Sequence, residues 1–124
     1  MDRKIQIMIV EDNPVNLKLV RDLLEMDGFE VFSCADAESA QECLETLHPD
    51  MILMDVGLPG MDGLELTRIL KADKKTGNIK IVAVTAFAMK TDKDKVMDAG
   101  CDGYITKPID TRKFTEQILQ LLKP

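Results

Sequence analysis

Five side chains that could take part in a reaction stand at the ends of apolar segments that we expect to be strands. They are Glu11, Asp12, Asp55, Thr85 and Lys107. The carboxyl ends of parallel strands meet at one edge of a sheet, so these groups should share one crevice there. Taken singly, each has an ordinary structural explanation, but their common position at the strand ends favours a site.

Three carboxylates in one crevice repel one another, and a divalent cation would relieve that repulsion. Ligation by oxygen alone suits Mg²⁺ better than a transition metal. A metal with open positions can hold a phosphoryl group, while the hydroxyl of Thr85 and the ammonium of Lys107 stabilise its other oxygens. Aspartate is a known nucleophile in such chemistry, so the set predicts phosphoryl transfer to Asp55. Asp62 follows the glycine-rich turn after this strand, and we expect it to cap a helix instead.

The elements that must position these groups alternate along the chain. Short apolar segments predict strands at residues 5–10, 29–34, 51–55, 79–85 and 102–106. Residues suited to helix caps predict the starts of four helices, at Asn13, at Asp36 or Ser39, at Asp62 and at Thr111. A further helix is expected between Ala88 and Ala99. Five alternations of strand and helix predict a (βα)5 α/β fold, with a parallel sheet covered by helices on both faces.

Apolar residues at helical spacing predict which side of each helix packs on the sheet. In the helix after Asp62, the inward residues should be Leu66, Ile69 and Leu70. In the helix between 88 and 99, the apolar face is weaker and consists of Met89, Val96 and Met97. The last helix should pack through Phe114, Ile118, Leu121 and Leu122.

Composition narrows the class of protein. The chain has 124 residues, 45% of them hydrophobic, and a formal net charge of −6. That length and composition predict one compact domain over residues 1–124. An acidic chain disfavours direct nucleic-acid binding, and without a signal sequence or a membrane-length apolar run we expect a cytoplasmic protein with no membrane partner. Three widely spaced cysteines and a single histidine, His48, argue against a zinc site, so we expect buried free thiols.

The chain resembles the receiver domain of two-component response regulators, the CheY-like group. The resemblance rests on Glu11-Asp12, Asp55, Thr85-Ala86 and Lys107-Pro108, which follow in the family's order and at matching intervals over essentially the whole chain. It implies a flavodoxin-like sheet of strand order 2-1-3-4-5. The segments 84–90 and 99–104 resemble in particular stand-alone receivers and receivers attached to hybrid histidine kinases.

The resemblance also implies a role for each residue of the crevice. Asp55 would accept the phosphoryl group from a phosphohistidine on a sensor histidine kinase or a histidine phosphotransfer protein. Asp12, Asp55 and the backbone carbonyl of Gly57 would bind Mg²⁺, and Glu11 would help through a water molecule.

The same resemblance implies a switch. Thr85 would hydrogen-bond the phosphoryl group and Lys107 would pair with it, while Tyr104 matches the family's switch aromatic, which turns inward as Thr85 moves. The face of the fourth helix, fifth strand and fifth helix would then change its affinity for a downstream protein target. Its character should come from five side chains of the fourth helix: Met89, Lys90, Lys93, Val96 and Met97.

One departure from the family pattern concerns the loss of phosphate. Many receivers carry polar side chains two residues after the phosphorylated Asp and two after the Thr, where they can position water. Gly57 and Phe87 occupy those positions here. We therefore expect slow hydrolysis, and a phosphoacceptor switch rather than a conventional enzyme.

Several other functions are compatible with an α/β chain of this size. A flavodoxin would need a hydroxyl- and glycine-rich loop after the first strand, where Glu11 and Asp12 stand instead. A phosphatase with an aspartyl-phosphate intermediate usually places a second Asp where Gly57 lies. A receiver-shaped adaptor, or a receiver fragment of a hybrid histidine kinase or larger regulator, remains an alternative.

Overall fold

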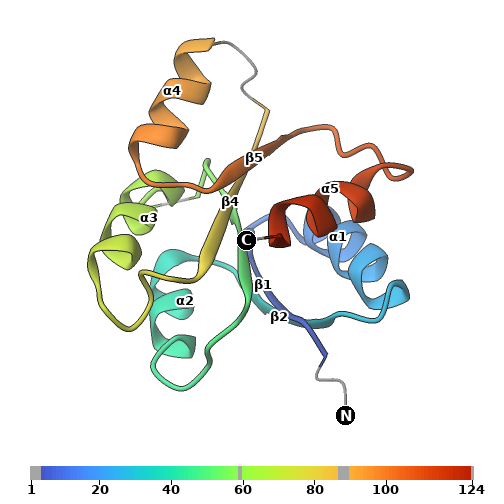
Figure 1. Cartoon of the computed structure of the whole chain (residues 1–124), viewed down its shortest axis with the longest axis horizontal. Helices are drawn as coiled ribbons and strands as arrows, with labels where there is room; N and C mark the ends of the chain where they lie inside the picture. The colour runs from blue at the N-terminus through green and yellow to red at the C-terminus, as the bar shows by residue number, and fades with distance from the viewer. Residues whose placement is uncertain (1–3, 59, 87–89, 124) are drawn as a thin grey trace.

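The computed structural model describes residues 4–58, 60–86 and 90–123. Within these residues, five strands alternate with five helices (Figure 1). The strands are β1 Gln6–Val10, β2 Glu30–Cys34, β3 Met51–Asp55, β4 Lys80–Thr85 and β5 Gly103–Thr106. The helices are α1 Pro14–Met26, α2 Ala37–Cys43, α3 Gly63–Ala72, α4 Lys90–Asp98 and α5 Phe114–Leu122. The predicted alternation is confirmed.

All five strands form one parallel sheet in the order β2-β1-β3-β4-β5, as expected. β3 lies at its centre, and every residue of β3 is buried, since strands flank it on both edges and helices cover both faces. In register, Val10 pairs with Met54 and Asp55 pairs with Val84. The central strands therefore end close together at the same edge of the sheet.

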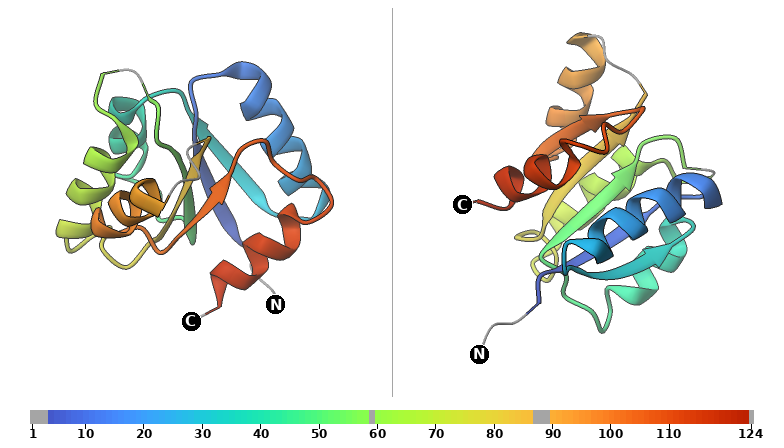
Figure 2. Two further views of the ribbon diagram at one scale, coloured as in Figure 1. Left: turned by 90° about the horizontal axis from the view of Figure 1, so that it is seen from above. Right: turned by 90° about the vertical axis from the view of Figure 1, so that its right-hand side faces the viewer.

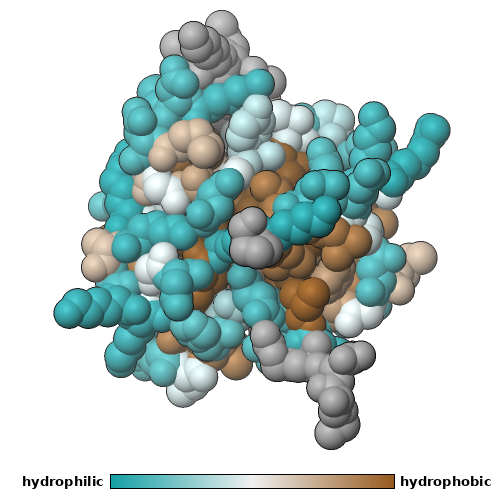
Figure 3. All heavy atoms as spheres, viewed as in Figure 1, coloured by the Kyte–Doolittle hydropathy of each residue, from teal (hydrophilic) through white to brown (hydrophobic). Residues whose placement is uncertain are grey.

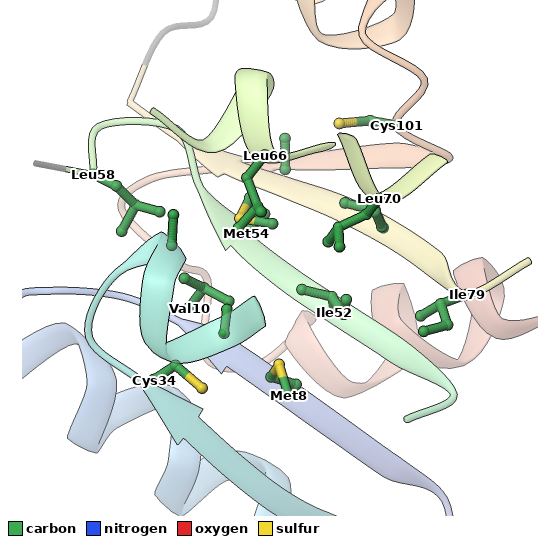
Figure 4. Packing of buried hydrophobic residues seen from close by; sticks show 14 of the residues in the cluster. Met8, Val10, Cys34, Ile52, Met54, Leu58, Leu66, Leu70, Ile79 and Cys101 are labelled. Atoms are coloured by element: carbon green, nitrogen blue, oxygen red, sulfur yellow. The ribbon is translucent and has the colours of Figure 1, made fainter. Parts of the chain in front are cut away.

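The helices form two layers, one on each side of the sheet. α1 and α5 cover one face, while α2, α3 and α4 cover the other, and the left view of Figure 2 shows the sheet between them. Each layer has its own apolar core. Phe114, Ile118 and Leu24 lie in the core under α1 and α5. Leu66 and Leu70 belong to the second core, part of which Figure 4 shows from close by.

Side-chain caps fix the starts of three helices where the sequence predicted them. Asn13 Oδ1 accepts hydrogen bonds from the amides of Val15 and Asn16, at 2.9 and 3.2 Å. Asp36 caps α2 through the amide of Ser39, so the helix starts after Asp36 and not after Ser39. Asp62 Oδ1 accepts from the amide of Glu65 at 2.8 Å and caps α3, as expected.

The predicted cap of the last helix was wrong. α5 begins at Phe114, after Lys113, and not at Thr111. Asp110 accounts for the difference, because its side chain accepts a hydrogen bond from the amide of Arg112 at 3.0 Å. Its carbonyl accepts from the amide of Lys113 at 3.1 Å. These bonds form a turn that delays the helix.

Two apolar residues also lie elsewhere than predicted. Ile69 is 40% exposed, because Gly63, Leu66, Thr67 and Leu70 already fill the buried side of α3. Met97 is 49% exposed, while its neighbour Val96 is buried. Met89 lies outside the described residues.

The C-terminal end of α5 is held by a side chain from the sheet. The ammonium of Lys80, the first residue of β4, donates a hydrogen bond to the carbonyl of Leu121 at 2.9 Å and another to the carbonyl of Lys123. A cation at this position is also favoured by the negative end of the helix dipole.

Figure 3 shows hydrophobic residues gathering around α1 and α5 on a face that is otherwise mostly hydrophilic.

Candidate phosphoacceptor site

Three carboxylates meet where β1 and β3 end. Glu11 and Asp12 directly follow β1, and Asp55 is the last residue of β3. One ligand oxygen from each lies within 4.8 Å of the others. Glu11 and Asp55 are buried, while Asp12 is exposed. Three oxygen donors at this spacing, with one side open to solvent, fit a hard divalent cation such as Mg²⁺.

Lys107 brings a positive charge to the same place from the end of β5. Its ammonium nitrogen lies 3.1 Å from Oε1 of Glu11 and 3.6 Å from Oδ1 of Asp55. The amide of Lys107 donates to the carbonyl of Thr85 at 2.8 Å, which fixes the chain after β5 against the end of β4. The cation is therefore positioned by backbone as well as by its carboxylate partners.

Backbone contacts hold Asp55 in place. The amide of Gly57 donates to Oδ1 of Asp55 at 3.0 Å. Behind the strand end, the first residue of α3 comes so close that a Cβ on Gly63 would lie 2.3 Å from the carbonyl oxygen of Asp55 and 2.9 Å from Cγ of Met54. Glycine at position 63 is thus a steric requirement for seating α3 against the acceptor residue.

Burial and mutual contact shift the pKa values of the two buried carboxyls in opposite directions. Burial raises the pKa of Glu11, and the neighbouring carboxylate of Asp55 raises it further. Burial alone would also raise the pKa of Asp55. Its hydrogen bonds to Glu11 and the amide of Gly57, together with Lys107, outweigh burial and hold that pKa below its ordinary value. Of the two buried carboxyls, Asp55 is therefore the one whose ionised form its contacts favour.

The structure also places Thr85 and Tyr104. Thr85 is buried at the end of β4, beside β3 in the sheet. Tyr104 is half-buried in β5 and packs against the core under α2, α3 and α4. Its ring lies under Lys93 of α4, with 5.2 Å between the ammonium nitrogen and the ring centroid. Phe87 and the side chain of Lys90 lie outside the described residues.

A cleft of about 400 Å³ opens beside the carboxylates, which is ample for a phosphoryl group. Glu11, Asp55 and Lys107 line its polar end. The cleft continues between α1 and the residues after β5, where Leu19 and Ile109 line it. A reacting group can therefore approach Asp55 along this side.

Sequence reasoning missed some contacts between side chains that are distant in the chain, and two of them involve residues discussed above. The ion pair between Glu11 and Lys107 joins the ends of β1 and β5, which are not neighbours in the sheet. The thiols of Cys34 and Cys43 lie 3.6 Å apart, although nine positions separate them in the chain. The spacing carried a weak signal for the second contact, because a strand end and the following helix lie side by side in a βαβ unit.

The chain belongs to the response regulator receiver domain family, whose model matches residues 7–119. The polar-differentiation response regulator DivK of Brucella ovis is 46% identical over 116 residues, which are 94% of each chain. These matches confirm the resemblance that the motifs indicated.

Solved structures agree with this assignment. The receiver domain of the sensor histidine kinase PA1611 of Pseudomonas aeruginosa is 32% identical, with a TM-score of 0.87 over 97% of this chain and 98% of that one. That structure has a magnesium ion coordinated in its active site cleft. A response regulator from Chloroflexus aurantiacus is 26% identical, with a TM-score of 0.92 over 97% and 98% of the two chains.

Among the residues that the structure describes, no helix combines the length and the apolar character needed to cross a membrane.

Proposed function

We propose that Asp55 accepts a phosphoryl group from a phosphohistidine on a sensor histidine kinase or a histidine phosphotransfer protein. The observation that carries this proposal is the ammonium of Lys107, which lies 3.6 Å from Oδ1 of Asp55. The same contact helps to hold the pKa of Asp55 below its ordinary value. An ionised carboxylate is the nucleophilic form, and a neighbouring cation can neutralise charge as the phosphoryl group arrives.

The acidic cluster supports a magnesium dependence. Asp12, Asp55 and the carbonyl of Gly57 would hold the ion, with Glu11 acting through a water molecule. When bound, the ion supplies positive charge to the oxygens of the incoming phosphoryl group and lets three carboxylates share one cleft. The magnesium ion in the related kinase receiver domain supports the same assignment here.

The transfer itself needs one nucleophile. A carboxylate oxygen of Asp55 attacks phosphorus while the nitrogen–phosphorus bond of the phosphohistidine breaks, and the imidazole leaves with the electron pair. Lys107 then faces a phosphoryl oxygen, and the hydroxyl of Thr85 donates to another. Both residues gain strong acceptors that the free carboxylate does not offer.

Those new contacts favour one conformation of a protein-binding face made by α4, β5 and α5. Thr85 precedes the loop into α4, and Lys107 precedes α5, so a pull on either residue reaches this face. Lys93 and the exposed Met97 give it mixed polar and apolar character. Tyr104 is the switch aromatic, and its inward turn would break its contact with Lys93. The readout is binding to a downstream protein, not to nucleic acid, because the chain carries a net charge of −6.

The chain therefore acts as a phosphorylation switch and not as a conventional enzyme, apart from self-phosphorylation by small donors and slow loss of the phosphate. The test is intact mass after incubation with a phosphorylated histidine phosphotransfer protein or acetyl phosphate, with and without Mg²⁺. One adduct of about 80 Da that requires Mg²⁺ is expected for the native chain.

Asp55→Asn should lose the adduct. Asp62→Asn is the matched control, because Asp62 caps α3 from the same turn region and asparagine caps equally well. An adduct that survives in Asp55→Asn would contradict the proposal. If neither donor phosphorylated the native chain, a receiver-shaped adaptor would be the better description.

A further inference from the structure

Cys34 and Cys43 bring two free thiols into contact. Cys34 is the last residue of β2, Cys43 is the last residue of α2, and their sulfurs lie 3.6 Å apart. We propose that this pair is a redox modification site, at which a peroxide oxidises the two thiols to an intramolecular disulfide. The proposal does not depend on the phosphoacceptor function.

The required movement is small. A disulfide joins its sulfurs at about 2.0 Å, so the two atoms must approach by roughly 1.6 Å. The backbone of Cys34 is fixed, because its carbonyl accepts a hydrogen bond from the amide of Glu11 at 3.0 Å and its Cα pairs with Val10 in the sheet. Cys43 is the last residue of its helix and is followed by turn residues 44–46. Cys43 is therefore the residue that moves towards Cys34.

The two thiols differ in access to solvent. Cys34 is 5% exposed and belongs to the core in Figure 4, whereas Cys43 is half-buried at the edge of that core. Burial, together with the hydrogen bond to Cys43, raises the pKa of Cys34 to about 12. A soluble oxidant therefore reaches Cys43 more readily than Cys34.

One peroxide molecule is enough to oxidise the two thiols to a disulfide. The sulfur of Cys43 attacks one peroxide oxygen, the oxygen–oxygen bond breaks, and a sulfenic acid and water result. The sulfur of Cys34 then attacks the sulfur of Cys43, the sulfur–oxygen bond breaks, and the departing hydroxide takes the proton of Cys34 to leave as water. Two thiols lose two electrons, and the peroxide gains them.

Cys101 provides an internal comparison. It is buried as well, but its sulfur faces the hydroxyl of Thr67 at 3.9 Å. Its own oxidation would therefore stop at an oxygen adduct instead of a disulfide with Cys34 or Cys43.

The test is oxidation of the reduced native chain with hydrogen peroxide, followed by intact mass, thiol counting in denaturant and peptide mapping. The expected product has lost about 2 Da, keeps one of its three thiols, and contains a peptide pair joined through Cys34 and Cys43 that dithiothreitol separates. Cys101→Ser should lose the same mass. Cys43→Ser, a change at the half-buried position, should not.

Oxygen adducts of about 16 or 32 Da on the native chain, with no loss of 2 Da, would overturn the proposal. So would a disulfide that involves Cys101 or a second copy of the chain. The mapping of the native chain decides the matter even if a serine variant fails to fold.

Discussion

The ammonium nitrogen of Lys107 lies 3.1 Å from Oε1 of Glu11, and 96 positions separate the two residues in the chain. This ion pair lies beside Asp55 and joins the residues that follow β1 and β5. Lys107 therefore contacts the acidic cluster in the unphosphorylated protein. Replacing Lys107 should change the free energy of unfolding of that form.

Lys107→Gln should lower the free energy of unfolding by about 1–2 kcal/mol in the absence of divalent ions, because Glu11 and Asp55 lose a cation within 4 Å. Urea unfolding in the presence of a chelator measures this. Lys113→Gln is the control, since Lys113 is exposed. Equal stability of Lys107→Gln and the native chain would show that the ion pair has no net value.

Glu11→Gln should stabilise the metal-free chain at pH 7. The folded-state pKa of Glu11 lies above its ordinary value of 4.5, so its contribution to stability is fully present below that value and is lost as the pH rises through the folded pKa. Glutamine mimics the protonated form. The gain should therefore shrink as the pH is lowered towards 4.5, as followed by urea unfolding with a chelator. A gain that grew on acidification would contradict a raised pKa of Glu11.

Asp55 changes the free energy of unfolding with pH in the opposite direction to Glu11. Its depressed pKa gives stability that is present above its ordinary value and is lost as the pH falls through the folded pKa. The hydrogen bond to Glu11 is one of the contacts that lower the pKa of Asp55. The difference between Glu11→Gln and the native chain at each pH therefore reports the two carboxyls as a pair.

Gly63→Ala should destabilise the chain by about 2–3 kcal/mol, because the new Cβ meets backbone and not the flexible end of a side chain. Gly57→Ala is the matched control. Its Cβ would lie 3.8 Å from Oδ1 of Asp55, an ordinary contact, and the change should stay within about 0.5 kcal/mol. Thermal or urea unfolding of both variants measures the difference, and equal losses would refute the steric argument.

The phosphorylated chain should lose its phosphate slowly, since Gly57 has no side chain to orient water. Gly57→Asn places an amide near Asp55 and should shorten the lifetime of the phosphorylated form roughly tenfold. Intact mass over time gives the lifetime. Gly60→Asn is the control, because its φ of +73° suits asparagine and no atom lies within 4 Å of its Cβ. Rapid loss from the native chain, unchanged in Gly57→Asn, would disprove this explanation.

The sequence allowed most of the fold and the principal candidate residues to be predicted, because both depend on local patterns. Strand ends follow from short apolar runs, and Asn13 and Asp62 cap helices through bonds to amides two or three residues away. Thr111 was misassigned because the side chain of the preceding residue, Asp110, accepts the hydrogen bond from the backbone amide of Arg112. This turn delays the start of the helix.

Contacts between distant elements were harder to predict. The strand ends predicted that Glu11 and Lys107 share one crevice, but not that they form an ion pair there. Nothing near Cys43 in the sequence gives the direction of its thiol. Ile69 shows the same limit in a helix, since helical spacing permits either an inward or an edge position. Packing of the neighbouring elements decides between them.

The hydrogen bonds from Lys80 to the end of α5 have a practical consequence when a fluorophore or an affinity tag is attached there. A rigid fusion placed directly after Lys123 would compete with the ammonium group for the last carbonyls of the helix. A flexible glycine–serine spacer at that end leaves these carbonyls in place. Biosensors built on this chain should therefore carry such a spacer, so that their signal reports the state of Asp55 and not an unwound helix end.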